Sequence, residues 1–374
     1  MDYLILSDIP TPWREPVFER IYRALGGAAR IVYFKSNEKR RLWKYGLGSH
    51  PKTILRGLTI NTHGTERFLN PGIILLLLWQ QPCIALVSAS IKDPTAWLAL
   101  VICKILRTKV ALLDDSWLGR ERKINILQKI ARRIMYKCFG DAFVGASRQT
   151  LLMLRYYNHR LIPQQLFLSH LAADNDYFQS RLSGKSFMRR FDVIFSGRIV
   201  QVKNPEFFAQ VCAGVRERIG QCRVLIIGEG DEDLKSAMRK IFNNHGVEYE
   251  FAGFIQHEAL PDYYTQARLL LLPTSGDCWG VVINEAMLAG TPVITTEMTA
   301  AAGELVIHGN NGAILPLDVD AWVNTVVEIL GDQEKWEQLS RNALEKVREF
   351  TFDKAAKGIL DAFSYLEARG GQAQ

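Results

Sequence analysis

Residues 269–294 combine a buried strand, a loop of small residues and a helix start with two carboxylates. The apolar run Leu269–Pro273 is typical of a buried parallel strand, and residues 275–294 read SGDCWGVVINEAMLAGTPVI. Free backbone N–H groups and the helix dipole make such a helix start attractive to anions. Asp277 in the loop and Glu285 in the helix add acceptors for hydroxyl groups. The combination suits a nucleotide-sugar, while an ordinary strand–helix crossover with a surface Asp and a capping Glu remains the alternative.

Two further groups of residues follow predicted strands in the same half of the chain. Gly197-Arg198 with Lys203 follows the strand predicted over residues 192–196, and Gly228-Glu229-Gly230 follows the strand predicted over 222–227. Ligands of parallel sheets bind beyond the carboxyl ends of the strands, so these groups should share one sheet edge with Asp277 and Glu285. A single G-x-G is equally typical of a tight turn.

Composition limits the class of protein. The chain has 374 residues, 48% of them hydrophobic and 23% charged, which predicts two globular domains with full cores. Its six cysteines form no C-x-x-C pair, so neither a disulfide framework nor a zinc site is indicated. We expect no signal peptide at the start of the chain, and the apolar run Ile73–Trp79 is too short to span a bilayer. We expect a cytoplasmic protein.

Charge is divided unevenly between the two halves. Residues 1–185 hold 28 Lys and Arg against 13 Asp and Glu, a net charge of +15, whereas residues 186–374 hold 18 against 26, a net charge of −8. This asymmetry suggests an anionic partner for the first half, either nucleic acid or a membrane surface, with a merely solvated basic surface as the alternative. No nucleic-acid recognition motif is present, so nucleic acid is not expected.

Basic residues interleaved with apolar ones cluster in two segments of that half. The first is RERKINILQKIARRIMYK, residues 120–137, which predicts a basic amphipathic helix over 120–139. Such a helix suits the surface of an anionic bilayer, and also suits the outer face of an ordinary packed helix. The second cluster is Trp43 with Lys39, Arg40, Arg41 and Lys44. Peripheral attachment to the cytoplasmic face of a membrane is therefore a possibility that the sequence leaves open.

Strand-like and helix-like segments alternate along both halves, which predicts two doubly wound α/β domains. The polar segment SRLSGKSFMRR, residues 180–190, suggests a boundary between domains at 1–185 and 186–349. Phe350–Leu366 has the pattern of a terminal helix, and we expect a helix over 350–370 to return to the first domain. The acidic triplets at 174–176 and 231–233 are interpreted as helix caps, and the scattered histidines have no spacing for metal ligands.

Five segments of the second half occur in an order that resembles a known family. They are FSGRIVQVKNPEFF, LIIGEGDEDLK, FAGFIQHEALPDYY, DCWGVVINEAMLAGTPVI and GELVIHGNNGAIL. Together they resemble family 4 (group 1) retaining glycosyltransferases over residues 190–350. The first half resembles the family only in its strand order and in the segment AADNDYF. The resemblance implies the GT-B fold, in which two Rossmann-like doubly wound domains face each other across a cleft, with acceptor bound by the first and donor by the second.

The resemblance also implies roles for four charged residues. Arg198 and Lys203 match the basic pair that holds the donor diphosphate and neutralises the leaving group, as their charges would allow. Asp277 matches a residue that contacts the donor sugar, and Glu285 one that accepts hydrogen bonds from ribose hydroxyls. The other donor positions that the resemblance implies, including backbone groups for the pyrophosphate and the base, are Gly197, Gly228, Gly253, Phe254, Trp279, Gly280 and Val281.

The sequence departs from the family at two places. The family usually has Glu where Asp277 stands, so the carboxylate here is about one methylene shorter. In the first half, IPTPWREP replaces the usual glycine-rich loop, and Asp114-Asp115-Ser116-Trp117 replaces a segment that often contains His. We therefore expect Arg14, Glu15 and Asp115 near the acceptor, although Arg14 and Glu15 equally fit a capped helix start.

The sequence thus predicts a retaining glycosyltransferase that uses a UDP- or GDP-sugar. Its acceptor would be a glycan, lipid-linked or a polysaccharide precursor, whose hydroxyl attacks the donor sugar on the same face that the diphosphate leaves. No cofactor or metal is expected, since Arg198, Lys203 and the helix start can supply positive charge. The alternatives are a GT-B epimerase or hydrolase, a phosphorylase, for which no pyridoxal site is indicated, and a small-molecule glycosyltransferase.

Overall fold

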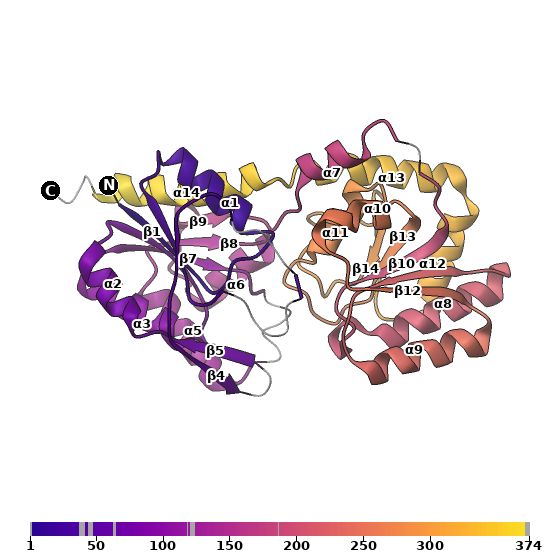
Figure 1. Ribbon diagram of the computed structural model, residues 1–374, viewed down its shortest axis with the longest axis horizontal. Coiled ribbons are helices and arrows are strands. Elements are labelled where there is room, and N and C mark those ends of the chain that lie inside the picture. Colours follow the sequence, from indigo (N-terminus) through magenta and orange to yellow (C-terminus); the bar gives the residue numbers. More distant parts are fainter. Residues whose placement is uncertain are drawn as a thin grey trace. The chain divides into compact units, whose positions relative to one another are not determined.

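The computed structural model describes residues 2–36, 42–43, 48–62, 65–117, 119, 124–185 and 187–370. The chain forms two compact units (Figure 1). The first contains Met1–Leu171 together with Phe352–Gln374, and the second contains Ala172–Thr351.

The first unit is built on a seven-stranded sheet with the order β3-β2-β1-β6-β7-β8-β9. Every neighbouring pair in it is parallel. The strands are β1 Tyr3–Ser7, β2 Ala29–Tyr33, β3 Lys52–Ile54, β6 Ile84–Ser88, β7 Lys109–Asp114, β8 Ala142–Gly145 and β9 Leu166–Leu168. A separate antiparallel pair consists of β4 Leu58–Thr62 and β5 Thr65–Leu69. The central strands are buried along their length, because helices cover both faces of a parallel sheet.

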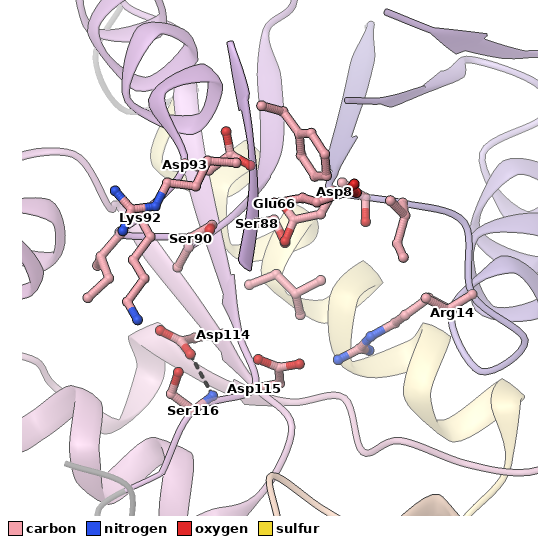
Figure 2. Close-up of a pocket in the computed structure, with 18 of the residues that line it drawn as sticks. Asp8, Arg14, Glu66, Ser88, Ser90, Lys92, Asp93, Asp114, Asp115 and Ser116 are labelled. Atoms are coloured by element: carbon pink, nitrogen blue, oxygen red, sulfur yellow. Dashed lines mark hydrogen bonds between the residues drawn. The ribbon is translucent and has the colours of Figure 1, made fainter. Parts of the chain in front are cut away.

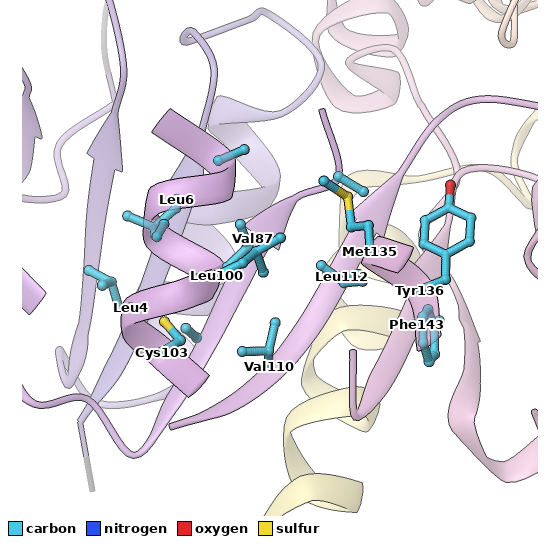
Figure 3. Close-up of a cluster of buried hydrophobic side chains, with 14 of the residues drawn as sticks. Leu4, Leu6, Val87, Leu100, Cys103, Val110, Leu112, Met135, Tyr136 and Phe143 are labelled. Atoms are coloured by element: carbon cyan, nitrogen blue, oxygen red, sulfur yellow. The ribbon is translucent and has the colours of Figure 1, made fainter. Parts of the chain in front are cut away.

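Helices cover both faces of this sheet. They are α1 Glu15–Ala24, α2 Gly72–Gln80, α3 Pro94–Ile105, α5 Ile126–Cys138, α6 Arg148–Tyr157 and α14 Phe352–Gly370, with a short 3₁₀ turn at Pro163–Gln165. Figure 3 shows one face, where Leu100 of α3 and Met135 of α5 meet Val87 and Leu112 of the sheet. On the other face α1 packs on α14, and the ring of Tyr3 stacks on Phe363 at 5.3 Å.

The second unit repeats the design with a six-stranded parallel sheet, ordered β12-β11-β10-β13-β14-β15. The strands are β10 Phe191–Ser196, β11 Arg223–Ile227, β12 Glu248–Gly253, β13 Ala267–Leu272, β14 Val293–Thr295 and β15 Gly312–Ile314. The helices are α7 Asn175–Leu182, α8 Pro205–Ile219, α9 Glu232–His245, α10 Leu260–Tyr264, α11 Val281–Leu288, α12 Val319–Gly331 and α13 Gln333–Val347, with 3₁₀ turns at Gln201–Lys203 and His257–Ala259.

The division between the units lies earlier than the predicted 185/186 boundary. It falls between Leu171 and Ala172, because α7 packs against α10 and α11 of the second unit. The Tyr177 hydroxyl donates to the Glu258 carbonyl at 2.7 Å, and Arg181 pairs with Asp262 at 2.6 Å. The polar segment 180–190 thus begins in the last turn of α7, which ends at Leu182, and stops where β10 begins at Phe191, a position that composition alone could not distinguish from a linker.

Parts of the predicted basic clusters lie outside the described residues. The helix expected over 120–139 is described from Ile126 to Cys138, and Arg120, Arg122 and Lys123 are not described. The same holds for Lys39, Arg40, Arg41 and Lys44 of the second cluster. Among the described helices, none combines the length and apolar character that crossing a bilayer requires.

Candidate functional site

The loops at the carboxyl edge of the second sheet lie backbone against backbone. The Gly228 N–H donates to the Gly253 carbonyl at 2.8 Å, and the Gly197 N–H donates to the Ile227 carbonyl at 3.0 Å. Gly228 has φ +131°, and a Cβ atom on it would lie 1.9 Å from the Gly197 carbonyl oxygen. Only glycine can take this position. Gly197 and Gly228 share the predicted sheet edge, and Gly253, which the resemblance implied, lies against them.

Lys203 and Asp277 lie in direct contact at this edge. The Lys203 ammonium pairs with Asp277 Oδ2, and their side chains are 14% and 20% exposed. The loop holding Asp277 is fixed on both sides, since the Ser275 N–H donates to the Val202 carbonyl at 2.8 Å and the Asp277 N–H to the Met298 carbonyl at 2.9 Å. Two of the predicted catalytic residues therefore form one partly accessible charged group. Arg198, the third predicted catalytic residue, is exposed just beyond β10.

Helix α11 begins beside this pair with an open N-terminus. Its cap residue is Gly280, at φ 83°, which has no side chain to satisfy the first N–H groups. Within the described part of the chain, the N–H groups of Val281 and Val282 donate to no protein acceptor. Unsatisfied N–H groups together with the positive end of the helix dipole provide an anion-binding position.

Trp279 anchors the loop before α11 rather than lining its surface. Its side chain is fully buried, its Nε1–H donates to Asn284 Oδ1 at 2.8 Å, and its ring lies 5.5 Å from that of Phe350. The Trp279 carbonyl also accepts a hydrogen bond from Thr299 Oγ1 at 2.7 Å. Trp279 thus contributes to the site through the position of its backbone.

Glu285 is a buried carboxylate with a neutral partner. It is 8% exposed, and its Oε2 accepts a hydrogen bond from the Tyr264 hydroxyl at 2.7 Å, which in turn lies 2.7 Å from Ser196 Oγ. Within the described chain, Oε1 has no hydrogen-bond partner. Burial raises the pKa of Glu285, although the hydrogen bond from Tyr264 acts against the shift. An acceptor oxygen thus remains available for a hydroxyl group.

Tyr264 and Ser196 were not predicted as part of the site. Tyr264 comes from the short helix LPDYY, where it has no distinguishing pattern, and Ser196 is the last residue of β10. Burial and the neighbouring Glu285 raise the pKa of Tyr264 well above its usual value, so it remains a hydrogen-bond donor at neutral pH. Phe254, which was predicted near the base, is half-buried directly after β12.

A second candidate site lies at the carboxyl edge of the first sheet. It is a cavity of about 380 Å³. Its walls follow β1, β6 and β7, with β5 and α5 completing it (Figure 2). Its ionisable lining residues are Asp8, Arg14, Glu66, Arg67, Lys92, Asp93, Asp114, Asp115 and Arg132. This mixture of charges suits a ligand that carries many hydroxyl groups, because carboxylates accept and guanidinium groups donate hydrogen bonds.

Arg14 and Asp115, both predicted, line this cavity and point toward one another (Figure 2). Arg14 is buried and donates to Ser169 Oγ at 3.0 Å. Burial lowers the pKa of Arg14 to about 10, and the charge of Asp115 acts in the opposite direction. Glu15 lies elsewhere: its carboxylate accepts hydrogen bonds from Tyr33 and from the Gly48 N–H, the latter at 2.9 Å. Glu15 therefore acts in the fold, but through Tyr33 and Gly48 and not as a cap, since the start of α1 has no side-chain cap hydrogen bond.

Two further carboxylates of the cavity were not predicted as site residues. Burial raises the pKa of Asp93 to about 6, while the Thr95 N–H that Asp93 caps at 3.2 Å acts against the shift. Asp114 accepts hydrogen bonds from the Tyr136 hydroxyl and from the Ser116 N–H, the latter at 2.7 Å. Asp93 precedes α3 and resembles any helix cap in sequence, so only the cavity distinguishes it. Among the described residues, no three His, Cys, Asp or Glu side chains are grouped as metal ligands.

Comparison with known proteins finds similarity mainly in the second unit. Residues 190–332 match the family model for "Glycosyl transferases group 1". A 2-deoxystreptamine N-acetyl-D-glucosaminyltransferase of Niallia circulans is 28% identical over 205 residues, 54% of this chain and 52% of that protein. An uncharacterized glycosyltransferase of Methanocaldococcus jannaschii is 27% identical over 175 residues, 46% of this chain and 44% of that protein. The similarity to these curated relatives thus spans about half of their length.

Solved structures are similar over almost the whole chain. Anabaena Alr3699/HepE, in complex with UDP, has a TM-score of 0.75 at 16% identity, covering 97% of this chain and 100% of that chain. The sucrose-phosphate synthase of Thermosynechococcus elongatus has a TM-score of 0.72 at 17% identity, covering 99% and 100%. Identities this low show a shared fold alone. They confirm the predicted GT-B fold class with its two Rossmann-like units.

Proposed function

From the group 1 glycosyltransferase domain that residues 190–332 form, we propose that this protein transfers a sugar from a nucleoside-diphosphate sugar to an acceptor hydroxyl. The observation that carries the proposal is the arrangement at one sheet edge of the Lys203–Asp277 pair, the open N-terminus of α11 and the free oxygen of Glu285. A cation, backbone donors and a carboxylate acceptor are the groups that a diphosphate and a ribose need.

In this proposal the second unit binds the donor and stabilises its leaving group. Lys203, Arg198 and the first N–H groups of α11 neutralise the diphosphate, while Glu285 Oε1 accepts hydrogen bonds from ribose hydroxyls. Asp277, held by Lys203, contacts the donor sugar. As the bond between the sugar carbon and the diphosphate oxygen breaks, negative charge develops on that oxygen. Preorganised positive groups at that place lower the barrier.

The transfer itself is proposed to retain the configuration of the sugar. The acceptor oxygen attacks the anomeric carbon on the face that the diphosphate leaves, and the acceptor proton passes to the departing phosphate oxygen. This route needs no protein nucleophile, so the protein mainly positions the two reactants. UDP-sugars are the first donors to test, since the structurally similar Anabaena Alr3699/HepE was crystallised with UDP and with UDP-glucose.

The acceptor is proposed to bind in the cavity of the first unit beside Arg14 and Asp115. Its nine ionisable lining residues favour a polar, hydroxyl-rich acceptor, such as a lipid-linked or polysaccharide-precursor glycan. A small-molecule acceptor is the second candidate, because one relative is named as a 2-deoxystreptamine N-acetyl-D-glucosaminyltransferase. Glycan acceptors and aminocyclitols therefore belong in the same acceptor screen.

The test is a thermal-shift screen of UDP-, GDP- and ADP-sugars, followed by turnover measurements. We expect one nucleotide class to raise the unfolding temperature of the wild type but not that of Glu285→Ala. Asp192→Ala is the matched control, because Asp192 is also buried but lies at the start of β10, where it accepts from the Arg223 N–H at 2.8 Å.

Two outcomes would contradict the proposal. The donor site is wrong if no nucleotide-sugar stabilises the protein, or if Glu285→Ala binds and turns over like Asp192→Ala. Release of free nucleotide without any glycosylated acceptor would instead indicate a hydrolase, and interconversion of two nucleotide-sugars would indicate an epimerase.

A further inference from the structure

The outer face of α5 exposes a row of large aliphatic side chains. Ile126, Leu127, Ile130 and Ile134 are 69%, 71%, 49% and 45% exposed. Spacings of three and four residues place them on one side of the helix. The inner side is formed by the buried Arg132, Met135 and Tyr136, so the row takes no part in the core of the unit.

Two cations lie among these aliphatic side chains. Arg133 and Lys137 are exposed on the same side of α5, and the helix contains no Asp or Glu. The neighbouring helix α6 is joined to α5 by a hydrogen bond from Asn158 Nδ2 to the Tyr136 carbonyl at 3.1 Å. It exposes Leu152, Arg155 and Tyr156. Residues 126–162 contain seven Lys and Arg but one acidic residue, Asp141. The surface is therefore both apolar and strongly basic.

We propose that this outer face of α5, extended by α6, binds an anionic lipid bilayer. A helix with aliphatic and cationic residues on one exposed side lies in the plane of the interface, where its aliphatic groups enter the acyl boundary and its cations meet lipid phosphates. A protein partner would have to bury Arg133 and Lys137 against acids, whereas a bilayer provides a continuous negative surface. The inference is independent of the proposed enzymatic activity.

The opposite side of α5 connects this surface to the cavity of the first unit. Arg132 lines the cavity and donates to Ser116 Oγ at 3.2 Å. The proposed bilayer surface and the cavity thus lie on opposite sides of the same helix. If the proposed function holds, a lipid-linked acceptor is favoured over a free one, and this step alone rests on that function.

The experiment is flotation of the full-length protein with phosphatidylcholine vesicles, with and without phosphatidylglycerol. One double variant is Arg133→Glu with Lys137→Glu, and a second is Ile130→Ser with Ile134→Ser. The matched control is Lys185→Glu with Lys240→Glu, which changes the net charge equally but at exposed positions of the second unit. Thermal unfolding of each variant verifies that it is folded.

We expect the wild type and the control to float with phosphatidylglycerol vesicles, and added salt to release them. Each cation near an anionic bilayer strengthens binding, so the α5 charge variant should bind at least about 30-fold more weakly. The serine variant should also lose binding, because its insertion into the acyl boundary is reduced.

Several results would overturn the proposal. They are flotation that does not depend on phosphatidylglycerol, unchanged flotation of both α5 variants, or an equal loss in the control. A wild-type dimer that the serine variant converts to monomer would make the face a self-association surface. Retention on duplex DNA without flotation would make it a nucleic-acid surface.

Discussion

The carboxyl edges of the two sheets differ in how their loops are packed, although the architecture is the same. In the second unit the loops close on each other, and Gly228 leaves no room for a Cβ atom against the Gly197 carbonyl. In the first unit the loops open into a cavity of about 380 Å³ with nine ionisable lining residues. Backbone groups can bind a diphosphate in almost any sugar donor, whereas choosing one acceptor requires individual side chains.

Two buried glutamates, one in each unit, have pKa values shifted in opposite directions. Burial raises the pKa of Glu285, which has the Tyr264 hydroxyl as its hydrogen-bond partner. Burial acts in the same direction on Glu15, but the neighbouring His50 and the hydrogen bond from the Gly48 N–H reverse the shift and lower its pKa. A buried carboxylate with many donors stabilises the fold, while one with an open oxygen is available to a ligand.

The largest effect should come from removing the cation of the second unit. In the proposed donor site Lys203→Ala would leave the diphosphate without its neutralising ammonium, and loss of one such group lowers kcat by about 10²–10³-fold. Steady-state kinetics with the donor found in the screen measure this decrease in kcat. Because Lys203 is partly exposed, the unfolding temperature should change little.

Lys240→Ala is the control for Lys203→Ala, since Lys240 is exposed on α9 of the same unit. It should retain wild-type kcat. If both variants keep full activity, the Lys203–Asp277 pair is a structural ion pair, and the contrast between the two sheet edges loses its chemical meaning.

Glu285→Gln should separate donor binding from stability. Loss of the charged acceptor should raise the KM for the donor by about 10–100-fold. A raised pKa means that ionisation of Glu285 costs stability as pH rises from the ordinary value of 4.5 through the folded value, and Gln removes that cost. The variant should therefore unfold at a higher temperature than the wild type at neutral pH, with the difference vanishing below pH 4.5.

Thermal unfolding at several pH values, with Asp192→Asn as the matched control, measures this second effect. Asp192 accepts from the Arg223 N–H and pairs with Arg223, so its variant should lose stability at neutral pH. A Glu285→Gln protein that is destabilised at neutral pH would show that Glu285 acts in the fold, as Glu15 does.

Much of the second unit could be predicted from sequence because local patterns determine it. The glycines at 197, 228 and 253, the break before α11 and the charged residues that follow strands each produce a short motif. Tyr264 escaped prediction because its partnership with Glu285 spans 21 positions and depends on how α10 packs against α11. Trp279 was assigned to the site by position, and only packing reveals that its ring is buried.

The first unit was less predictable for a physical reason. Its cavity joins residues from β1, β5, β6, β7 and α5, and no short segment of sequence contains that arrangement. Arg14 and Asp115 were predicted because they stand where the resemblance places the segments that line the acceptor, whereas Asp93 resembles an ordinary helix cap. The domain boundary was displaced because α7 is polar and its docking on the second unit leaves no periodic pattern.

A smaller effect, confined to the acceptor, should follow from changing the cavity of the first unit. Asp115→Asn keeps the shape of an exposed side chain but removes its charge, so it should raise the KM for the acceptor by about tenfold. Donor-induced thermal stabilisation should be unchanged. Lys357→Asn on α14, exposed in the same unit, should alter neither constant. If Asp115→Asn weakens donor binding instead, the assignment of acceptor and donor to different units is wrong.

The smallest effect should come from His50, which is buried between two acids of the first unit. Its Nδ1 lies 2.9 Å from Glu19 and its Nε2 3.6 Å from Glu15, and although burial lowers its pKa, these acids raise it overall. The stability that charged His50 provides is therefore complete below its ordinary pKa of 6.5 and is lost as pH rises through the raised value. Replacement by Gln should cost about 1 kcal/mol near pH 6 and less in alkaline solution, measured by urea unfolding. The stability lost in His50→Gln should thus shrink as pH rises, whereas the stability gained in Glu285→Gln should grow above pH 4.5. If the two variants show the same pH profile, Glu285 and Glu15, which lies beside His50, do not differ in role.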